Sequence, residues 1–210
     1  MNTMKTDISG KYYAESKEAE EILAWAESSN PGRWIGHSKY TGLACRLIAE
    51  NCPDMDPEKA YSVGLLHDIG RYVGVVRGRH QIEGYRICME KGWDANARVC
   101  LTHSQVLKDL AKSLDYWDIS AEDYEFFNHY IQNIEFDDYD LLVQLSDCLA
   151  LPSGFCIIEK RMIDVARRYG VNKDSVARWN KIFELKDYFN RKTGSNIYKY
   201  LQNIEENTIV

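Results

Sequence analysis

The chain has 210 residues, of which 45% are hydrophobic and 28% are charged, and its formal net charge is −6 at pH 7. These values predict an ordered globular protein with a sizeable core, and they exclude a disordered chain. The excess of acidic residues disfavours nonspecific binding to nucleic acid or to anionic membranes, since both attract basic patches.

Apolar residues recur at helical spacing along most of the chain, and the alternation that marks strands is rare. We expect a first helix at about 14–27 and a second at about 34–51. Asp56 has the features of an N-cap and Pro57 those of a first helical residue, so a third helix is expected to begin there. It carries the segment AYSVGLLHD, and we expect it to end at Gly70 because glycine favours the position after a helix.

The rest of the chain continues this helical pattern. Four further helices are expected, at about 79–91, 94–103, 121–131 and 138–149. Two more, at about 155–169 and 173–190, predict a helical hairpin that turns at the sequence Tyr-Gly-Val-Asn. We therefore expect an all-α fold, a helix bundle with short connections.

One part of this hairpin, residues 165–179, is similar to a DNA-binding helix-turn-helix. A recognition helix must present an exposed, basic surface to DNA, usually in a dimer. Here the second helix continues as NKIFELKDYF, whose large apolar residues favour burial. We therefore favour a hairpin that closes the bundle, and nucleic acid is not an expected partner.

The sequence predicts neither a membrane protein nor a secreted one. Its apolar runs fall short of the roughly 20 residues that cross a bilayer, and the N-terminal segment has no signal-peptide core. The six cysteines are scattered, with no C-x-x-C pair, as in proteins with reduced thiols. We therefore expect a cytoplasmic protein, and we leave open whether it is a monomer or a homodimer.

The residue types and helical positions of two histidines and two aspartates are typical of metal ligands. His67 and Asp68 are adjacent near the end of the third expected helix, where a buried carboxylate would be costly without a cation. His37 lies on an inward face of the second helix, and Asp147 interrupts an apolar helix. Together they predict a divalent cation site, whose mixed chemistry does not choose among Mn, Fe, Co, Ni, Zn and Mg. Taken alone, His37 or Asp147 would more often be a structural residue than a metal ligand.

Two further histidines stand at helix ends. His80 opens the expected helix at 79–91, and His103 closes the one at 94–103. If both face the same cavity, they can hold a second cation, with Asp68 bridging the two. The alternative for each ring is a helix cap.

Arginines gather directly after the His-Asp pair, in the sequence RYVGVVRGR. Arg71, three residues past Asp68, is the strongest candidate for a phosphate contact, because a guanidinium can bind phosphate as a bidentate fork. Arg79 and Arg33 are further candidates for substrate binding. For Arg77 and Arg79, a solvated loop is an equal alternative.

The order of His37, the pair His67-Asp68 and Asp147, with the motif HDIGR after an apolar helix, resembles the HD superfamily of metal-dependent phosphohydrolases. The resemblance covers about 36–151. In that family the residues at these four places bind one metal ion, so the resemblance implies the same ligands here.

In particular, the layout is similar to the dinuclear HD-type bacterial enzymes that cleave diadenosine tetraphosphate to ADP. Members of this subset have two more histidines between the pair and the last aspartate, and His80 and His103 match those places. The chain departs from the pattern in two ways. Arg71 stands where many relatives have lysine, and the segment from Pro152 onward does not resemble these enzymes.

We expect a single HD domain over 1–210, with a metal core at about 34–151 and a hairpin at 153–210 packed on it. The resemblance implies hydrolysis of a phosphate ester or anhydride, in a nucleotide or another small molecule, by metal-activated water. Asp68 and Arg71 would be catalytic, and one or two divalent ions the cofactor. Two alternatives stay open: an HD-fold diiron oxygenase with the same ligands, and a non-catalytic metal- or nucleotide-binding regulatory module.

Overall fold

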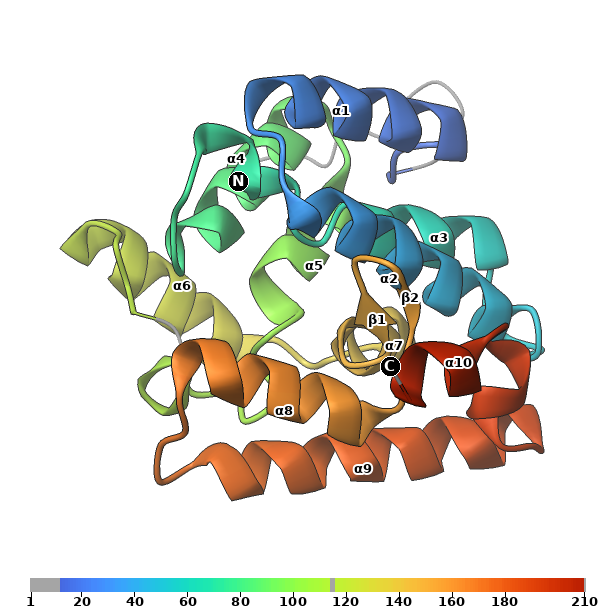
Figure 1. The fold of residues 1–210 in the computed structure, drawn as a ribbon. Coiled ribbons are helices and arrows are strands. Elements are labelled where there is room, and N and C mark those ends of the chain that lie inside the picture. Colours follow the sequence, from blue (N-terminus) through green and yellow to red (C-terminus); the bar gives the residue numbers. More distant parts are fainter. Residues whose placement is uncertain (1–11, 114–115, 210) are drawn as a thin grey trace.

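Helices form almost all of the regular structure (Figure 1), which confirms the expected all-α class. The computed structural model describes residues 12–113 and 116–209. Within them the α-helices are α1 (Ser16–Ser29), α2 (Arg33–Ala49), α3 (Pro57–Leu65), α4 (Arg79–Glu90), α5 (Asp94–Thr102), α6 (Ala121–Asn133), α7 (Asp138–Asp147), α8 (Ile158–Tyr169), α9 (Ser175–Thr193) and α10 (Ile204–Ile209). The short elements are the 3-10 helices η1 (Ile69–Val73), η2 (Leu110–Lys112) and η3 (Ile197–Tyr200) and the strands β1 (Ala150–Leu151) and β2 (Gly154–Phe155).

Side-chain caps fix the starts of helices close to where the sequence predicts them. The Asp56 carboxylate accepts a hydrogen bond from Glu58 N at 2.9 Å, and α3 begins at the proline between them. At α7, Asp137 accepts from Asp140 N at 3.1 Å, and Asp140 Oδ2 accepts from Asp137 N at 2.9 Å. This reciprocal cap fixes the beginning of the helix that carries Asp147.

The third helix ends earlier than the sequence predicts. α3 stops at Leu65, and a turn leads into η1. His67 and Asp68 therefore lie in this turn rather than within a helix. Gly70 does not cap the helix but is a point of close approach, because a Cβ there would overlap the carbonyl oxygen of His80 in α4. The glycine lets the start of α4 pack directly against the backbone of η1.

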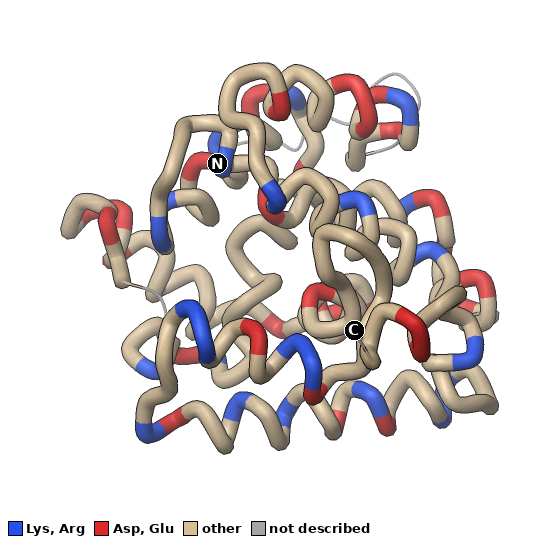
Figure 2. Tube along the Cα trace, in the orientation of Figure 1, with Lys and Arg blue, Asp and Glu red and all other residues tan. Residues whose placement is uncertain are grey.

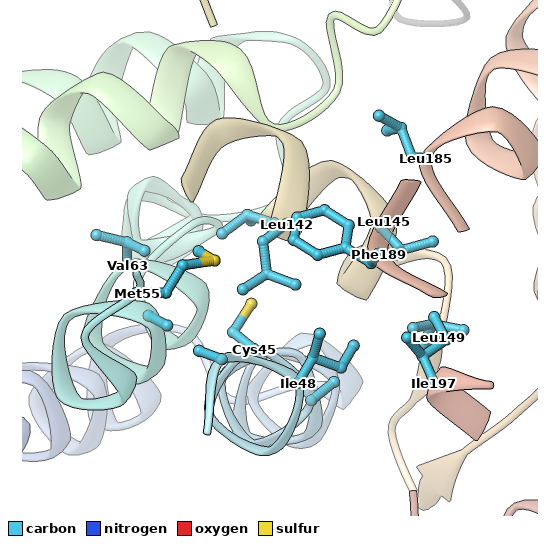
Figure 3. Close-up of a cluster of buried hydrophobic side chains, with 14 of the residues drawn as sticks. Cys45, Ile48, Met55, Val63, Leu142, Leu145, Leu149, Leu185, Phe189 and Ile197 are labelled. Atoms are coloured by element: carbon cyan, nitrogen blue, oxygen red, sulfur yellow. The ribbon is translucent and has the colours of Figure 1, made fainter. Parts of the chain in front are cut away.

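The main core lies between α2, α3, α7 and α9 (Figure 3). Its fully buried side chains include Cys45 and Ile48 of α2, Val63 of α3, Leu145 of α7 and Phe189 of α9. Burial of an aliphatic or aromatic side chain of this size stabilises a fold by roughly 1.5–3 kcal/mol. Because α9 contributes to the same core as α2 and α3, the C-terminal helices are packed directly on the N-terminal ones.

A two-stranded antiparallel hairpin joins α7 to α8, where the sequence predicts a helix from about 155. In β1 and β2, Ala150 pairs with Phe155. α8 consequently begins later than expected, at Ile158. The hairpin lies against α2 and brings the carbonyl oxygen of Ala150 to the imidazole of His37.

The helices α8 and α9 form the expected hairpin, and η3 and α10, which the sequence does not predict, follow it. α9 buries Ile182, Leu185 and Phe189, so it is not the exposed recognition helix of a helix-turn-helix. Basic and acidic positions are interspersed along both helices (Figure 2). A helix with the length and apolarity to cross a bilayer is not found in the described part of the chain.

Candidate metal centre

The centre of the candidate site is the carboxylate of Asp68, which is 5% exposed. Its Oδ1 lies 3.0 Å from His80 Nε2 and 3.8 Å from His103 Nε2. Its Oδ2 accepts a hydrogen bond from Arg71 Nε at 2.6 Å. Oδ1 therefore faces the imidazoles of His80 and His103, whereas Oδ2 faces the Arg71 guanidinium and lies 3.9 Å from His67 Nε2.

Four buried histidines use the same ring nitrogen to contact a backbone carbonyl. The contacts join Nδ1 of His37, His67, His80 and His103 to the carbonyl oxygens of Ala150, Gly64, Arg77 and Cys100, respectively. Because a carbonyl oxygen only accepts hydrogen bonds, each Nδ1 carries a proton, and Nε2 of the neutral ring presents a lone pair. Metal-binding histidines characteristically donate from their second ring nitrogen in this way.

The Nε2 atoms and the Asp68 carboxylate form two sets that share Asp68. His37, His67 and Asp68 make one set, and Asp68, His80 and His103 make the other, with the ligand atoms of each set within 4.8 Å of one another. All five side chains are buried. A carboxylate shared between two groups of imidazole nitrogens is an arrangement that can hold two metal ions.

Two of these atoms are buried without a hydrogen-bond partner among the described residues. They are Asp68 Oδ1 and His80 Nε2, which lie 3.0 Å apart but do not have the geometry of a hydrogen bond. A buried polar atom without a partner costs about 1–3 kcal/mol. A cation between the two lone pairs would remove this cost, so the residues present fit a divalent ion that accepts nitrogen and oxygen ligands.

Asp147, the remaining predicted ligand, belongs to neither set. Its Oδ1 lies 2.9 Å from His37 Nε2. The same oxygen accepts a hydrogen bond from Arg161 Nη2 at 3.0 Å, and the Asp147 carbonyl oxygen accepts one from Arg161 Nε at 3.1 Å. The structure therefore brings five of the six predicted ligands together around Asp68, and it ties Asp147 to His37 and to an arginine that the sequence does not predict.

Burial and nearby cations act in opposite directions on the pKa values of the carboxylates. Burial raises the pKa of Asp68, but its polar neighbours, the Arg71 guanidinium above all, together outweigh burial and hold the pKa well below its usual range. Burial likewise raises the pKa of Asp147, and Arg161 outweighs this effect. Burial lowers the pKa of His67, and it lowers that of His103 to about 3. Charged carboxylates and neutral imidazoles are the protonation states that metal ligands require.

A cavity of about 340 Å³ opens beside the ligands. His37, Asp68, His80, His103 and Asp147 line one part of it. Among the described residues, six arginines and three aspartates line it altogether. The arginines are Arg33, Arg71, Arg77, Arg161, Arg168 and Arg178. A protein whose formal net charge is −6 thus encloses a cavity with an excess of positive side chains.

Only some of the predicted phosphate-binding residues line the cavity. Arg33 and Arg71 line the cavity. Arg79 is not among its lining residues, because its side chain follows the outer face of α4, where Nε donates to Glu83 Oε1 at 2.9 Å. Arg77, two residues before it, does line the cavity.

The contribution of α8 to the cavity is not among the sequence-based predictions. Arg161, Asp164, Val165 and Arg168 line the cavity, and their spacing along the chain puts them on one face of a helix. The signal is present in the sequence IEKRMIDVARRY, whose basic positions can be followed along α8 (Figure 2). Nothing in the sequence alone shows that this face meets the metal ligands.

The fold and these side chains define an all-α protein with a His/Asp cluster that could hold metal ions. A family model described as the HDOD domain, an HD-related output domain, matches residues 27–112, which is less than half of the chain. The matched segment includes all five side chains of the two ligand sets and ends before Asp147. No curated protein and no solved structure gave a match. The match supports a likeness to HD-related domains, and the finer resemblance to diadenosine-tetraphosphate hydrolases stays a prediction.

Proposed function

We propose that the protein is a metal-dependent phosphohydrolase that acts on a small phosphate ester or anhydride, such as a nucleotide. The observation that carries the proposal is the juxtaposition of two elements. One is the pair of ligand sets that share Asp68, and the other is the arginine-lined cavity that opens beside them. The ligands suit a divalent ion, and the arginines suit the anionic substrate on which such an ion would act.

The charge and size of the cavity favour a small phosphorylated ligand. Six arginines against three aspartates leave three positive charges in excess before any ion is bound. A guanidinium can contact phosphate with two parallel N–H groups, which fixes its orientation as well as its charge. At about 340 Å³, the cavity lies near the lower end of the roughly 300–1,000 Å³ range typical of ligand sites. This volume suits a compact ligand and not a polymer.

Each group near Asp68 has a role in this chemistry. A divalent ion held by either ligand set would lower the pKa of a water molecule and neutralise charge on a phosphoryl group. Asp68 can anchor an ion beside His80 and His103 through Oδ1, while Oδ2 holds Arg71 at 2.6 Å and fixes the direction of its guanidinium at the cavity wall. Arg71 can therefore orient phosphate without losing its contact with the ligand carboxylate.

The test is turnover by the purified chain after chelator treatment. We expect release of phosphate or of a shorter nucleotide when Mn, Fe, Co, Ni, Zn or Mg is added back with a panel of phosphomonoesters and nucleotides. The variant Asp68→Asn should abolish this release. Absence of hydrolysis with every ion, in protein that binds those ions, would refute the proposal. Oxygen uptake by an iron-loaded sample would instead favour the diiron oxygenase.

The family match favours a second candidate, because HDOD domains are often regulatory or signalling modules. In that case the cavity would bind a phosphorylated ligand and leave it intact. Calorimetry with a nucleotide, followed by chromatography of the same sample, separates the two candidates. Binding with complete recovery of the nucleotide would favour the regulatory module.

A further inference from the structure

Arg161 brings a guanidinium group from α8 into contact with two predicted metal ligands. Its Nη2 donates to Asp147 Oδ1 at 3.0 Å and lies 3.3 Å from His37 Nε2. Its Nε donates to the Asp147 carbonyl oxygen at 3.1 Å. The Arg161 side chain is 12% exposed, so these contacts lie where water screens charge poorly.

The acceptor atoms of His37 and Asp147 face each other and require a positive group beside them. His37 Nε2 and Asp147 Oδ1 are 2.9 Å apart. Because His37 Nδ1 donates to Ala150 O, Nε2 of the neutral ring holds a lone pair, as the carboxylate oxygen does. Arg161 Nη2 has two hydrogens, one for each acceptor. The guanidinium thus serves this pair as a divalent cation would.

The ligand set of His80 and His103, on the other side of Asp68, has no guanidinium from a described residue between its acceptor atoms. His80 Nε2 and Asp68 Oδ1 are buried and make no hydrogen bond with any described residue. Arg71 is bound to the second oxygen, Oδ2, and not to Oδ1. A cation that enters beside His80 therefore breaks no hydrogen bond of these two atoms. A cation that enters between His37 and Asp147 must displace Arg161.

The Arg161 side chain has room for an alternative position in the cavity. Its Nη1 donates to Asp164 Oδ2 at 3.3 Å, and Asp164 lies one turn further along α8. Both side chains line the cavity. If the guanidinium swings away from His37 and Asp147, it can keep its pairing with Asp164 and face the cavity, where an anionic ligand would meet it.

We infer that Arg161 is an internal counter-cation that competes with a divalent ion for His37 and Asp147. The two sides of Asp68 then bind metal ions with unequal affinity, and the side of His80 and His103 fills first. This inference rests on the metal-binding part of the proposed function and is independent of hydrolysis. Binding of the second ion also releases a positive side chain toward the substrate cavity.

Calorimetric titration of Mn²⁺ into the chelator-treated full chain tests the inference. We expect two binding events of unequal affinity in the unmodified protein. In Arg161→Gln the weaker event should tighten by about tenfold, roughly the contribution of one charge-assisted hydrogen bond, and the stronger event should not change. Arg168→Gln is the matched control, because Arg168 lines the same cavity but bonds to Asp164 and not to a metal ligand. Both events should stay within about twofold in this control.

Several results would overturn the inference. Weaker Mn²⁺ binding in Arg161→Gln would make Arg161 a positioning residue that holds Asp147 for the ion, and unchanged binding would show that it does not compete. Equal tightening in Arg168→Gln would show a general effect of charge. Should Arg161→Gln not fold, Arg161→Lys keeps the charge but can bridge fewer acceptors, so it should tighten the weaker event by a smaller factor.

The failure of this inference can be told apart from the failure of the proposed function. The expected Mn²⁺ titration in a protein without hydrolytic activity would uphold the inference and refute the hydrolase. Hydrolysis with unchanged Mn²⁺ binding in Arg161→Gln would do the reverse. A chain that binds no Mn²⁺ would contradict the inference, whereas the proposed function would fail only if none of the six ions supports hydrolysis.

Discussion

The two sides of Asp68 have the same kinds of ligand but differ in the groups that contact those ligands. On one side, His80 Nε2 is buried and has no hydrogen-bond partner among the described residues. On the other side, His37 Nε2 lies 2.9 Å from Asp147 Oδ1 and 3.3 Å from Arg161 Nη2. The identity of the ligands therefore does not by itself define a metal site, because a neighbouring cation can already satisfy the same lone pairs.

The two sides also come from different parts of the chain. The side of His80 and His103 lies wholly within the segment that matches the HDOD model, residues 27–112. The side of His37 depends on Asp147 and Arg161, which lie beyond that segment. A metal ion on the first side would therefore need only residues of the matched segment, whereas an ion on the second side would also depend on how α7 and α8 pack against it.

The largest effect is expected for Asp68→Asn, because this substitution alters the ligand that the two sides share. Asparagine keeps the shape of the side chain but removes the charge that both ligand sets share. Mn²⁺ binding on both sides should weaken by more than the 10–100-fold that follows loss of a mere supporting partner. Calorimetry measures this, with a thermal melt to show that the variant is folded. Retention of either binding event at its original affinity would show that Asp68 is not shared.

A pair of variants separates the two sides. His80→Ala should weaken the stronger Mn²⁺ event by about a hundredfold, because it removes a ligand that faces no competing cation. His37→Ala should abolish the weaker event and leave the stronger one within a few-fold of its original affinity. The reverse assignment would mean that the side of His37 fills first, in spite of Arg161.

The metal-free protein should lose stability on acidification because burial lowers the pKa values of His67 and His103. Burial lowers the pKa of His103 from the usual 6.5 to about 3 in the folded protein. Below pH 6.5 the unfolded chain binds a proton that the folded chain does not, so the free energy of unfolding falls as the pH decreases. The loss at pH 5 is about 2 kcal/mol from this ring alone. The Asp68 and Asp147 carboxylates, whose pKa values lie below 3.8 in the folded protein, stay charged between pH 7 and pH 5. They therefore do not change the free energy of unfolding over this range.

Urea unfolding at pH 7 and pH 5, in the presence of a chelator, measures this effect. His103→Gln is the matched variant, because glutamine cannot take up the proton. Its stability should depend less on pH than that of the unmodified protein. An equal dependence in both would show that His103 does not contribute.

The smallest effect is expected at the rim of the cavity, where two arginines two residues apart make a matched pair. Arg77 lines the cavity, whereas Arg79 bonds to Glu83 outside it. Because Arg77 is exposed and its charge is screened, Arg77→Gln should weaken binding of inorganic phosphate to the metal-loaded protein by only about fivefold. Arg79→Gln should change it by less than about twofold. Equal effects of both substitutions would place the phosphate elsewhere.

Much of the fold could be predicted from the sequence because its signals are local. Asp56 and the proline after it mark the start of α3 through a cap that involves adjacent residues. The end of α3 could not be predicted in this way. Gly70 suggests a helix C-terminus by its type, but its actual role depends on the close approach of α4, which is a tertiary contact.

The candidate site likewise contains residues that local sequence signals identify and residues whose role depends on tertiary contacts. His67, Asp68, His80 and His103 could be found because their types and their places near helix ends are visible in the chain. Arg161 could not be found, since its role depends on the packing of α8 against α2 and α7 and not on its neighbours in sequence.

The carbonyl contacts of the four imidazoles have a consequence for the kinetics of ion capture. Fixing a mobile side chain when a ligand binds costs about 0.5–1.5 kcal/mol. Here the rings are already ordered when the chain has folded, through bonds to Ala150, Gly64, Arg77 and Cys100. Ion capture at these rings therefore requires no slow rearrangement of the ligands. Its rate should be set by loss of water from the ion and, beside His37, by the departure of one guanidinium.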